Sequence, residues 1–246
     1  MDRMIYLAMT AATQNLRAQG IAANNLANAN TTGFKSDFAA FRAMPVFADG
    51  FPSRVYAMTE RPGINYQPGT IETTGNELDV SVNGEGFIAV QSADGSEAYT
   101  RAGNLKITAT GQLLTDDDLP VLGNGGPMGV PPNASVVVGV DGTVSIRPLG
   151  QDANTLAQVD RIKLVKPAPQ DLIKGPDGLF RLRSGPPAEP DASVRLASGT
   201  LERSNVNSVS EMIGMIENQR NYDMAVKAMH TAQENDSAGD RLLQLG

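Results

Sequence analysis

Apolar positions recur with a helical period at both ends of this chain and with a strand period between them. In the first segment, steps of four and three residues alternate through Ile5, Met9, Ala12, Leu16, Gln19, Ala23 and Leu26. This heptad-type seam predicts a helix over residues 4–29. The last segment repeats the spacing through Val209, Met212, Ile216, Gln219, Asp223, Val226, His230 and Gln233, broadened by Ile213, Tyr222 and Met229. It predicts a second helix over residues 205–245.

The middle of the chain alternates with the period of two that is typical of strands. "ELDVSVNGEGFIAVQSADG" predicts strands around an Asn83-Gly84 turn and an Asp94-Gly95 turn, and "SVVVGVDGTVSIRP" predicts a hairpin over Asp141-Gly142. "RIKLVKP" and "GLFRLRS" predict two further short strands. Because no helical stretch could cover a parallel sheet here, we expect a mostly antiparallel domain.

These patterns together predict an α+β fold in which the long terminal helices pair as a coiled coil beside a central antiparallel β domain. Prolines and glycines interrupt the segment after the first helix, which predicts extended pieces and favours a hairpin over "RPGINYQPGTIETTG". The expected divisions are an N-terminal helix, an irregular linker, the β domain and a C-terminal helix, at residues 1–35, 36–75, 76–200 and 201–246.

The first helix carries almost no charge, since Arg17 is the only charged residue between Met4 and Phe34. The surface helix of a monomer normally has a charged outer face. A second stripe consists almost entirely of small residues: Met4, Ala8, Ala11, Asn15, Ala18, Ala22, Asn25 and Ala29. We therefore expect this helix to be surrounded by other helices through close contacts of small residues.

Four asparagines crowd the end of this helix, at positions 24, 25, 28 and 30. Asparagine is a poor helix former because its side chain competes for backbone hydrogen bonds. The uncharged amides could bond to neighbouring helices and fix their register, or they could simply fray and cap the helix end. The spacing leaves both interpretations open. Gly33 is predicted to end the helix as a left-handed cap.

Composition and charge exclude several classes of function. The 246-residue chain has a net charge of −7 and no basic patch, which argues against nucleic-acid binding. The chain has no cysteine, so disulfides and thiolate metal sites are excluded. No run approaches the roughly 20 apolar residues that span a bilayer. "IYLAMTAA" has only the minimum length of a signal-peptide core and the helical pattern continues past it, so we expect no cleaved signal peptide.

The sequence contains no pattern that predicts catalysis. His230, the only histidine, lies on a helix without the partners of a triad or a metal site. "GEGFIA" matches a dinucleotide-binding pattern but continues as a strand instead of opening a helix. Asp116, Asp117 and Asp118 run into Leu119-Pro120, which indicates a solvated turn. We therefore predict no catalytic, cofactor-binding or metal-binding residues.

Three segments resemble the bacterial flagellar rod and hook axial proteins. "ANNLANANTTGFK", residues 23–35, resembles the family signature N-N-[LI]-A-N-x-[NS]-T-x-G-[FY]-[KR] at the end of a long N-terminal helix. "ELDVSVNGEGFIAVQ", followed by "YTRAGNLKITATGQLLT", resembles the family's central β domain. The last helix is similar to the family's C-terminal helix at Ser204 to Val206, Glu211 to Ile213 and Gln219 to Tyr222. The opening "MDRMIYLAM" and the length most resemble the proximal rod members, with the distal rod as the nearest alternative.

The resemblance implies a structural subunit of the flagellar basal body and not an enzyme. Such subunits stack with copies of themselves and with other rod subunits into a hollow helical shaft across the periplasm, which transmits torque and passes export substrates. The terminal helices would line its inner tube. Export would run through the flagellar type III apparatus without a cleaved signal peptide, and neither a cofactor nor membrane insertion is implied.

From the two seams and the asparagine-rich segment we predict an assembly interface. It comprises Ile5, Met9, Ala12, Leu16, Ala23, Asn24, Asn25, Leu26, Asn28, Asn30, Gly33, Met212, Ile216, Gln219, Tyr222 and Val226. Two other classes compete with this interpretation. A secreted β-domain enzyme with helical oligomerisation tails would use acidic groups such as Asp79, Glu85 and Asp117. An adhesin would use the tails as a coiled coil.

Overall fold

The computed structural model describes residues 3–38, 41–45, 55–59, 63–148 and 155–244. The chain forms two compact units. Unit 1 takes its described residues from Met1–Ala29, Ser36–Asn65 and Val206–Gly246, and unit 2 from Asn30–Lys35 and Tyr66–Asn205. Each unit therefore combines segments that lie far apart in the sequence.

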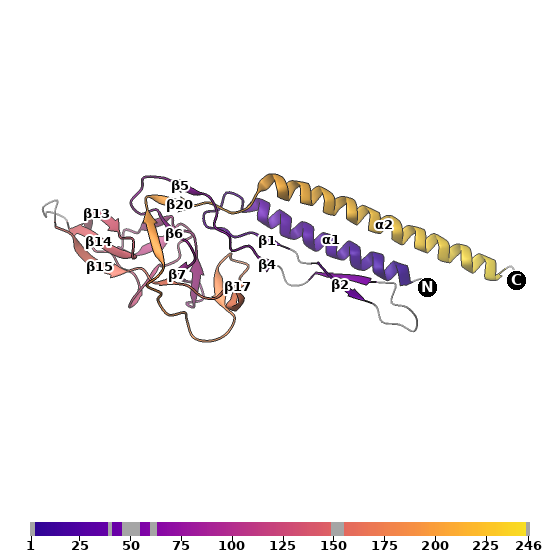
Figure 1. The fold of residues 1–246 in the computed structure, drawn as a ribbon, viewed down its shortest axis with the longest axis horizontal. Coiled ribbons are helices and arrows are strands. Elements are labelled where there is room, and N and C mark those ends of the chain that lie inside the picture. The colour runs from indigo at the N-terminus through magenta and orange to yellow at the C-terminus, as the bar shows by residue number, and fades with distance from the viewer. Residues whose placement is uncertain (1–2, 39–40, 46–54, 60–62, 149–154, 245–246) are drawn as a thin grey trace. The chain divides into compact units, whose positions relative to one another are not determined.

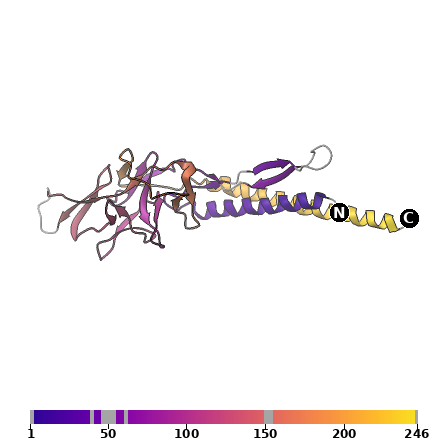
Figure 2. The ribbon, with the colours of Figure 1, turned by 90° about the horizontal axis from the view of Figure 1, so that it is seen from below.

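Unit 1 contains both terminal helices, α1 (Arg3–Ala27) and α2 (Ser208–Gln244), lying antiparallel along one another (Figures 1 and 2). The Gln19 side chain donates to Gln219 Oε1 at 3.3 Å, and Asn25 Nδ2 donates to Glu211 Oε1 at 3.0 Å. Asn25 follows Gln19 on α1, whereas its partner Glu211 precedes Gln219 on α2. The two hydrogen bonds therefore define an antiparallel register.

The buried faces of the two helices are made of small residues. On α1 they include Ala8, Ala12, Ala18 and Ala22, and on α2 they include Ala225 and Ala232. The large members of the predicted seams, such as Leu16 and Ile216, stay exposed. Small residues thus dominate the buried faces, although Ala12 belongs to the four-and-three seam and the seam residues Gln19 and Gln219 bond to each other across the two helices. Periodicity reveals that two stripes run along α1, but it does not identify the one that meets α2.

Four short strands complete unit 1. β1 (Asp37–Phe38) pairs antiparallel with β4 (Gly63–Ile64), and β2 (Phe41–Pro45) pairs antiparallel with β3 (Val55–Thr59). β1 and β3 pack against α1. The sequence predicted this segment as irregular, because its prolines and glycines hid the β2–β3 pairing.

The hairpin predicted over residues 61–75 is wrong, although residues 61–62 lie outside the described part. β4 pairs with β1, while β5 (Ile71–Thr73), in unit 2, pairs with β20 (Thr200–Glu202). Turn-forming residues mark where a chain reverses, but they do not select the partner of a strand.

Unit 2 is built from antiparallel strand pairs, as the sequence predicted. Its five-stranded sheet has the order β16 (Leu164–Val165), β7 (Phe87–Gln91), β8 (Glu97–Thr100), β18 (Phe180–Leu182) and β17 (Leu172–Lys174). A three-stranded sheet contains β13 (Asn133–Val138), β14 (Thr143–Pro148) and β15 (Ala157–Arg161). The two-stranded sheets are β6 (Val80–Asn83) with β19 (Arg195–Ser198), β9 (Leu105–Ile107) with β10 (Leu113–Thr115), β11 (Leu122–Gly123) with β12 (Gly126–Pro127), and β5 with β20. One 3-10 turn spans Pro169–Asp171.

Two predicted hairpins are confirmed and one is wrong. β7 pairs with β8 across Asp94-Gly95, and β13 pairs with β14 across Asp141-Gly142. Across Asn83-Gly84, however, β6 pairs with β19 and β7 pairs with β8 and β16. Gly84 and Gly86 both have positive φ, 82° and 140°, so the chain turns there without bringing β6 and β7 together as a pair.

The core of unit 2 is aliphatic and continuous. It includes Val80, Ile88, Val90 and Leu113, which are fully buried. Leu196 on β19 belongs to the same core, so the strands just before α2 help to close it.

Candidate functional site: an exposed helical surface and a buried charge cluster

Asn25, on α1, uses its amide inside the subunit. Its Nδ2 donates to the Asp37 carbonyl at 2.7 Å and to Glu211 Oε1 at 3.0 Å, and its Oδ1 accepts from the Asp37 N–H at 2.9 Å. The side chain is 1% exposed. One amide therefore ties the end of α1 to β1 and to the first turn of α2.

The other asparagines of the segment play different parts. The Asn28 N–H donates to the carbonyls of Asn24 and Asn25, both at 3.1 Å, and Asn28 Nδ2 donates to Asn24 O at 2.9 Å. These bonds finish the helix. Asn24 and Asn30 are exposed. Both interpretations of the asparagines thus find support, at different positions: Asn25 joins elements and Asn28 caps.

The start of α2 is capped by an asparagine too. Asn207 Oδ1 accepts from the Ser210 N–H at 3.1 Å, and its carbonyl accepts from the Glu211 N–H at 3.0 Å. An asparagine at this position satisfies a free N–H group of the first turn. The cap places Glu211 one turn into α2, where its carboxylate accepts the hydrogen bond from Asn25.

The residues predicted for the assembly interface divide into three groups. Exposed members are Met9, Leu16, Ala23, Asn24, Asn30, Met212, Ile216 and Gln219. Half-buried members are Ile5, Leu26, Asn28, Tyr222 and Val226. Buried members are Ala12, Asn25 and Gly33. The exposed group contains the large apolar side chains of the seams.

Large apolar side chains stay exposed along both helices. They are Met4, Tyr6, Met9 and Leu16 on α1, and Val209, Met212, Ile213, Ile216 and Met224 on α2. We call this set the outer helical surface. Single exposed apolar residues are common on proteins, but a concentration of them marks a site of association. No helix among those described is long and apolar enough to cross a membrane.

Gly33 does not cap α1, because the helix ends six residues earlier at Ala27. The prediction of a left-handed conformation is confirmed, with φ of 68°. The need for glycine comes from unit 2. A Cβ at this position would lie 2.2 Å from the backbone carbon of Arg101. The Gly33 N–H donates to the Glu202 carbonyl at 2.7 Å, so this residue packs backbone against backbone.

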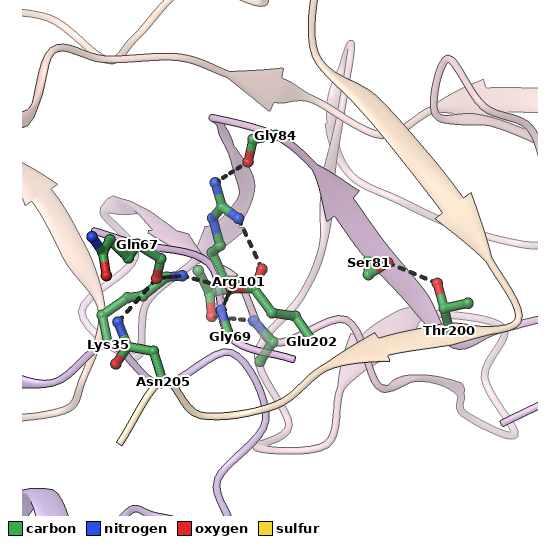
Figure 3. A network of polar contacts seen from close by, with 11 residues as sticks. Lys35, Gln67, Gly69, Ser81, Gly84, Arg101, Thr200, Glu202 and Asn205 are labelled. Atoms are coloured by element: carbon green, nitrogen blue, oxygen red, sulfur yellow. Dashed lines mark hydrogen bonds and ion pairs between the residues drawn. The ribbon is translucent and has the colours of Figure 1, made fainter. Parts of the chain in front are cut away.

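Next to Gly33, three charged side chains meet in the interior of unit 2 (Figure 3). Lys35 Nζ lies 2.5 Å from Glu202 Oε1, and Arg101 Nη1 lies 2.8 Å from Glu202 Oε2. The exposed fractions of Lys35, Arg101 and Glu202 are 1%, 4% and 1%. We call these three residues the buried charge cluster.

Main-chain groups complete the buried charge cluster. The Gly69 N–H donates to Glu202 Oε1 at 2.9 Å, Lys35 Nζ donates to Gln67 O at 2.8 Å, and Arg101 Nη2 donates to Gly84 O at 2.6 Å. The Arg101 guanidinium also lies 5.5 Å from the centre of the Phe87 ring. Charge-assisted bonds thereby hold together the segments around positions 35, 67–69, 84, 101 and 202.

The electrostatics of the cluster favour an ionised carboxylate. Burial acts to raise the pKa of Glu202, but the hydrogen bond from Lys35 and the positive charge of Arg101 outweigh it and hold the pKa below its usual range. Burial lowers the pKa of Lys35, and the Glu202 carboxylate opposes this shift. A buried charge is tolerated only when it is paired in this way.

Sequence reasoning missed this cluster. Its members stand in the segments "TGFK", "YTRAG" and "LERSN", far apart along the chain. The available signal was a charged residue next to alanine, phenylalanine or leucine in each segment. This signal does not show which charged residues pair with one another, because ion pairs leave no periodicity in a sequence.

The acidic residues of the enzyme alternative do not gather in a pocket. Asp79 accepts from Asn76 Nδ2 at 3.1 Å, Glu85 forms an exposed ion pair with Lys166, and Asp117 is exposed. An open pocket of about 450 Å³ in unit 2 is lined by other acidic residues, including Asp171 and Asp191. Within the described ranges, no group of His, Asp and Glu could hold a metal ion.

An exposed apolar helical surface in a chain that also contains a β domain is typical of structural proteins that associate through their helices. Three family profiles match the chain: "Flagella basal body rod protein" over residues 5–35, "Flagellar hook protein FlgE/F/G D1 domain" over residues 81–146, and "Flagellar basal body rod FlgEFG protein C-terminal" over residues 197–242.

Relatives agree with these profiles. The Escherichia coli flagellar basal-body rod protein FlgF is 41% identical over 251 positions, covering 100% of both chains. FlgF of Caulobacter vibrioides is 37% identical, covering 98% of each chain, and FlgG of Bacillus subtilis is 35% identical, covering 86% of this chain and 88% of the relative. The chain belongs to the family of flagellar basal-body rod proteins, and it is more similar to these FlgF members than to this FlgG.

Proposed function

We propose that this protein is a structural subunit of the flagellar basal-body rod, in its proximal part, and acts by assembly without catalysis. The observation that carries the proposal is the outer helical surface. Apolar side chains from both terminal helices remain exposed in the single chain, and the helices have already used their small residues to pair with each other. A second layer of helices, from neighbouring subunits, would cover this surface.

Two finer statements are part of the proposal. The terminal helices form the inner tube domain and pair with each other as a coiled coil, which the seam spacing supports. The subunit polymerises with copies of itself and with other rod subunits in the periplasm, after export through the type III apparatus without a cleaved signal peptide. Relatives named as rod proteins over the full length of the chain support this placement.

The alternatives are less well supported. A distal position is not favoured, because the FlgG relatives cover less of this chain than the FlgF relatives do. The relatives are named for a structural role, and Asp79, Glu85 and Asp117 do not share a pocket.

The experiment that tests the proposal starts from an in-frame deletion of the gene in its source bacterium. The deletion should abolish swimming and leave basal bodies with a missing or truncated rod in electron micrographs, and the full-length gene should restore both. A gene carrying Leu16→Asp should not restore them, because a charge cannot be buried without a partner. Leu16→Met is the matched control, since it keeps an apolar side chain at the same exposed position, and it should restore swimming.

Purified Leu16→Asp protein should unfold at the same urea concentration as the unaltered protein, because Leu16 is 49% exposed in the single chain. Loss of swimming would then reflect lost assembly. Normal swimming of the deletion strain with intact basal bodies would contradict the proposal as a whole. If the Leu16→Asp gene restored swimming, the outer helical surface would not be the surface through which the subunit assembles.

A further inference from the structure

Glu202, the only anionic residue described in the buried charge cluster, lies near the C-terminal end of unit 2. The side chains of Lys35 and Arg101 form their described hydrogen bonds and ion pairs with Glu202 and with two main-chain carbonyls, those of Gln67 and Gly84. Both cations precede Glu202 in the chain, by 167 and 101 positions. Any process that delivers the chain from its N-terminus presents both cations before it presents their counter-ion.

Without Glu202, closure of unit 2 would enclose two positive charges and no negative charge. Main-chain carbonyls solvate a cation only in part, and an ionised group buried without a partner is strongly destabilising. In the complete unit the backbone packs closely around the cluster: a Cβ on Gly33 would lie 2.2 Å from the backbone of Arg101, and one on Gly69 would lie 1.8 Å from the Arg203 carbonyl oxygen.

We infer that Glu202 is the closing residue of unit 2, the counter-ion without which Lys35 and Arg101 keep this unit open. Folding of unit 2 then awaits the arrival of residue 202, although the residues of its described aliphatic core all precede that position. A chain delivered N-terminus first stays open until nearly its full length is available. The inference concerns folding alone and stands or falls independently of the rod proposal.

The first test compares two glutamate substitutions in the full-length protein by native-state hydrogen exchange at the core amides of Val80, Ile88 and Leu113. Glu202→Gln keeps the shape and removes the charge, and it should lower the protection of these amides about a hundredfold or more. Glu72→Gln is the matched control, because Glu72 pairs with Arg203, the residue after Glu202, in an exposed ion pair. It should change protection by no more than about fivefold.

The second test separates the role of counter-ion from that of a packed, hydrogen-bonded side chain. Lys35→Met combined with Glu202→Gln removes one of the two uncompensated cations, so the double variant should be protected at least about tenfold better than Glu202→Gln alone. Purely additive losses would overturn the inference, and so would a Glu202→Gln protein as well protected as Glu72→Gln. If Glu202→Gln fails to fold, recovery of protected core amides in the double variant supports the inference, and failure of both variants overturns it.

Discussion

Asn25 and Asp37 exchange two hydrogen bonds, one donated by the Asn25 amide at 2.7 Å and one accepted by it at 2.9 Å. The side chain thereby imitates the backbone of a neighbouring strand. The same amide nitrogen donates to Glu211 on α2. The last turn of α1, the chain that leaves it and the first turn of α2 are joined through a single uncharged group.

Asn25→Asp should destabilise unit 1 by about 2–3 kcal/mol. The substitution removes the donor to the Asp37 carbonyl and places a carboxylate 3.0 Å from that of Glu211, where a hydrogen bond stood. Hydrogen exchange at the amides of α1 measures the effect. Asn24→Asp is the control: it introduces the same charge near the same helix end at an exposed site, so it shares any unfavourable effect of the helix dipole. Equal losses in both variants would contradict the joining role of Asn25.

Gly33→Ala should destabilise unit 2 far more than Gly75→Ala does. Both glycines have positive φ, 68° and 75°, so alanine pays the same conformational penalty of about 1 kcal/mol at each. Only at Gly33 would the new Cβ meet backbone, at 2.2 Å from Arg101, whereas nothing lies within 4 Å at Gly75. We expect about 3 kcal/mol or more for Gly33→Ala, measured by urea unfolding. Similar values for the two variants would show that conformation alone requires glycine at position 33.

Local patterns in the sequence predicted the elements whose identity depends on neighbours along the chain. Both helices and the hairpins at Asp94-Gly95 and Asp141-Gly142 belong to this group, because hydrophobic period and turn residues act within a few positions. The pairing of β6 with β19 and the role of Gly33 were not predictable in this way. Strand β6 pairs with a strand more than a hundred positions away, and Gly33 packs against Arg101, more than sixty positions away. Neither partner leaves a periodic trace in the sequence.

The predicted interface shows the same limit. Met9 and Ile216, which the seam spacing marked, are exposed in the single chain, but the spacing did not reveal that the buried faces of α1 and α2 consist mainly of small residues. The buried charge cluster was missed entirely, since single charges at positions 35, 101 and 202 have no common spacing.

Acid should destabilise unit 2 through Glu202. Its pKa is held below the ordinary value of 4.5, so its contribution to stability is present above that value and is lost as the pH falls through the lower pKa of the folded state. Asp141 and Asp177 have lowered pKa values too, chiefly from hydrogen bonds with Thr143 and Arg181, and act in the same direction. Between its folded-state and unfolded-state pKa values, Glu202 lowers the free energy of unfolding by about 1.4 kcal/mol per pH unit, whereas the exposed Asp141 and Asp177 contribute less because solvent screens their interactions.

The measurement is an NMR titration of the Glu202 carboxyl carbon alongside urea unfolding from neutral pH to about pH 3. We expect Glu202 to remain ionised below the pH at which an ordinary glutamate takes up its proton. A Glu202 that titrates above 4.5 would mean that burial outweighs its two cationic partners, and the unfolding free energy would then not fall on acidification through this residue.

Ala22→Leu should separate the terminal helices, whereas Ala23→Leu should leave them paired. Ala22 is buried on the face of α1 that carries the small residues, and Ala23, one position further, is exposed. Three added carbons at a packed position cost about 1–3 kcal/mol through overpacking, while an exposed leucine changes stability by about 0.5 kcal/mol or less. The two variants have the same composition and the same helix propensity, so packing is the only difference between them. Thermal unfolding followed by helical circular dichroism should show a lower midpoint for Ala22→Leu alone. A common midpoint would mean that the small-residue stripe does not determine how closely α1 and α2 approach, and the large residues of the seams would then have to supply the contact.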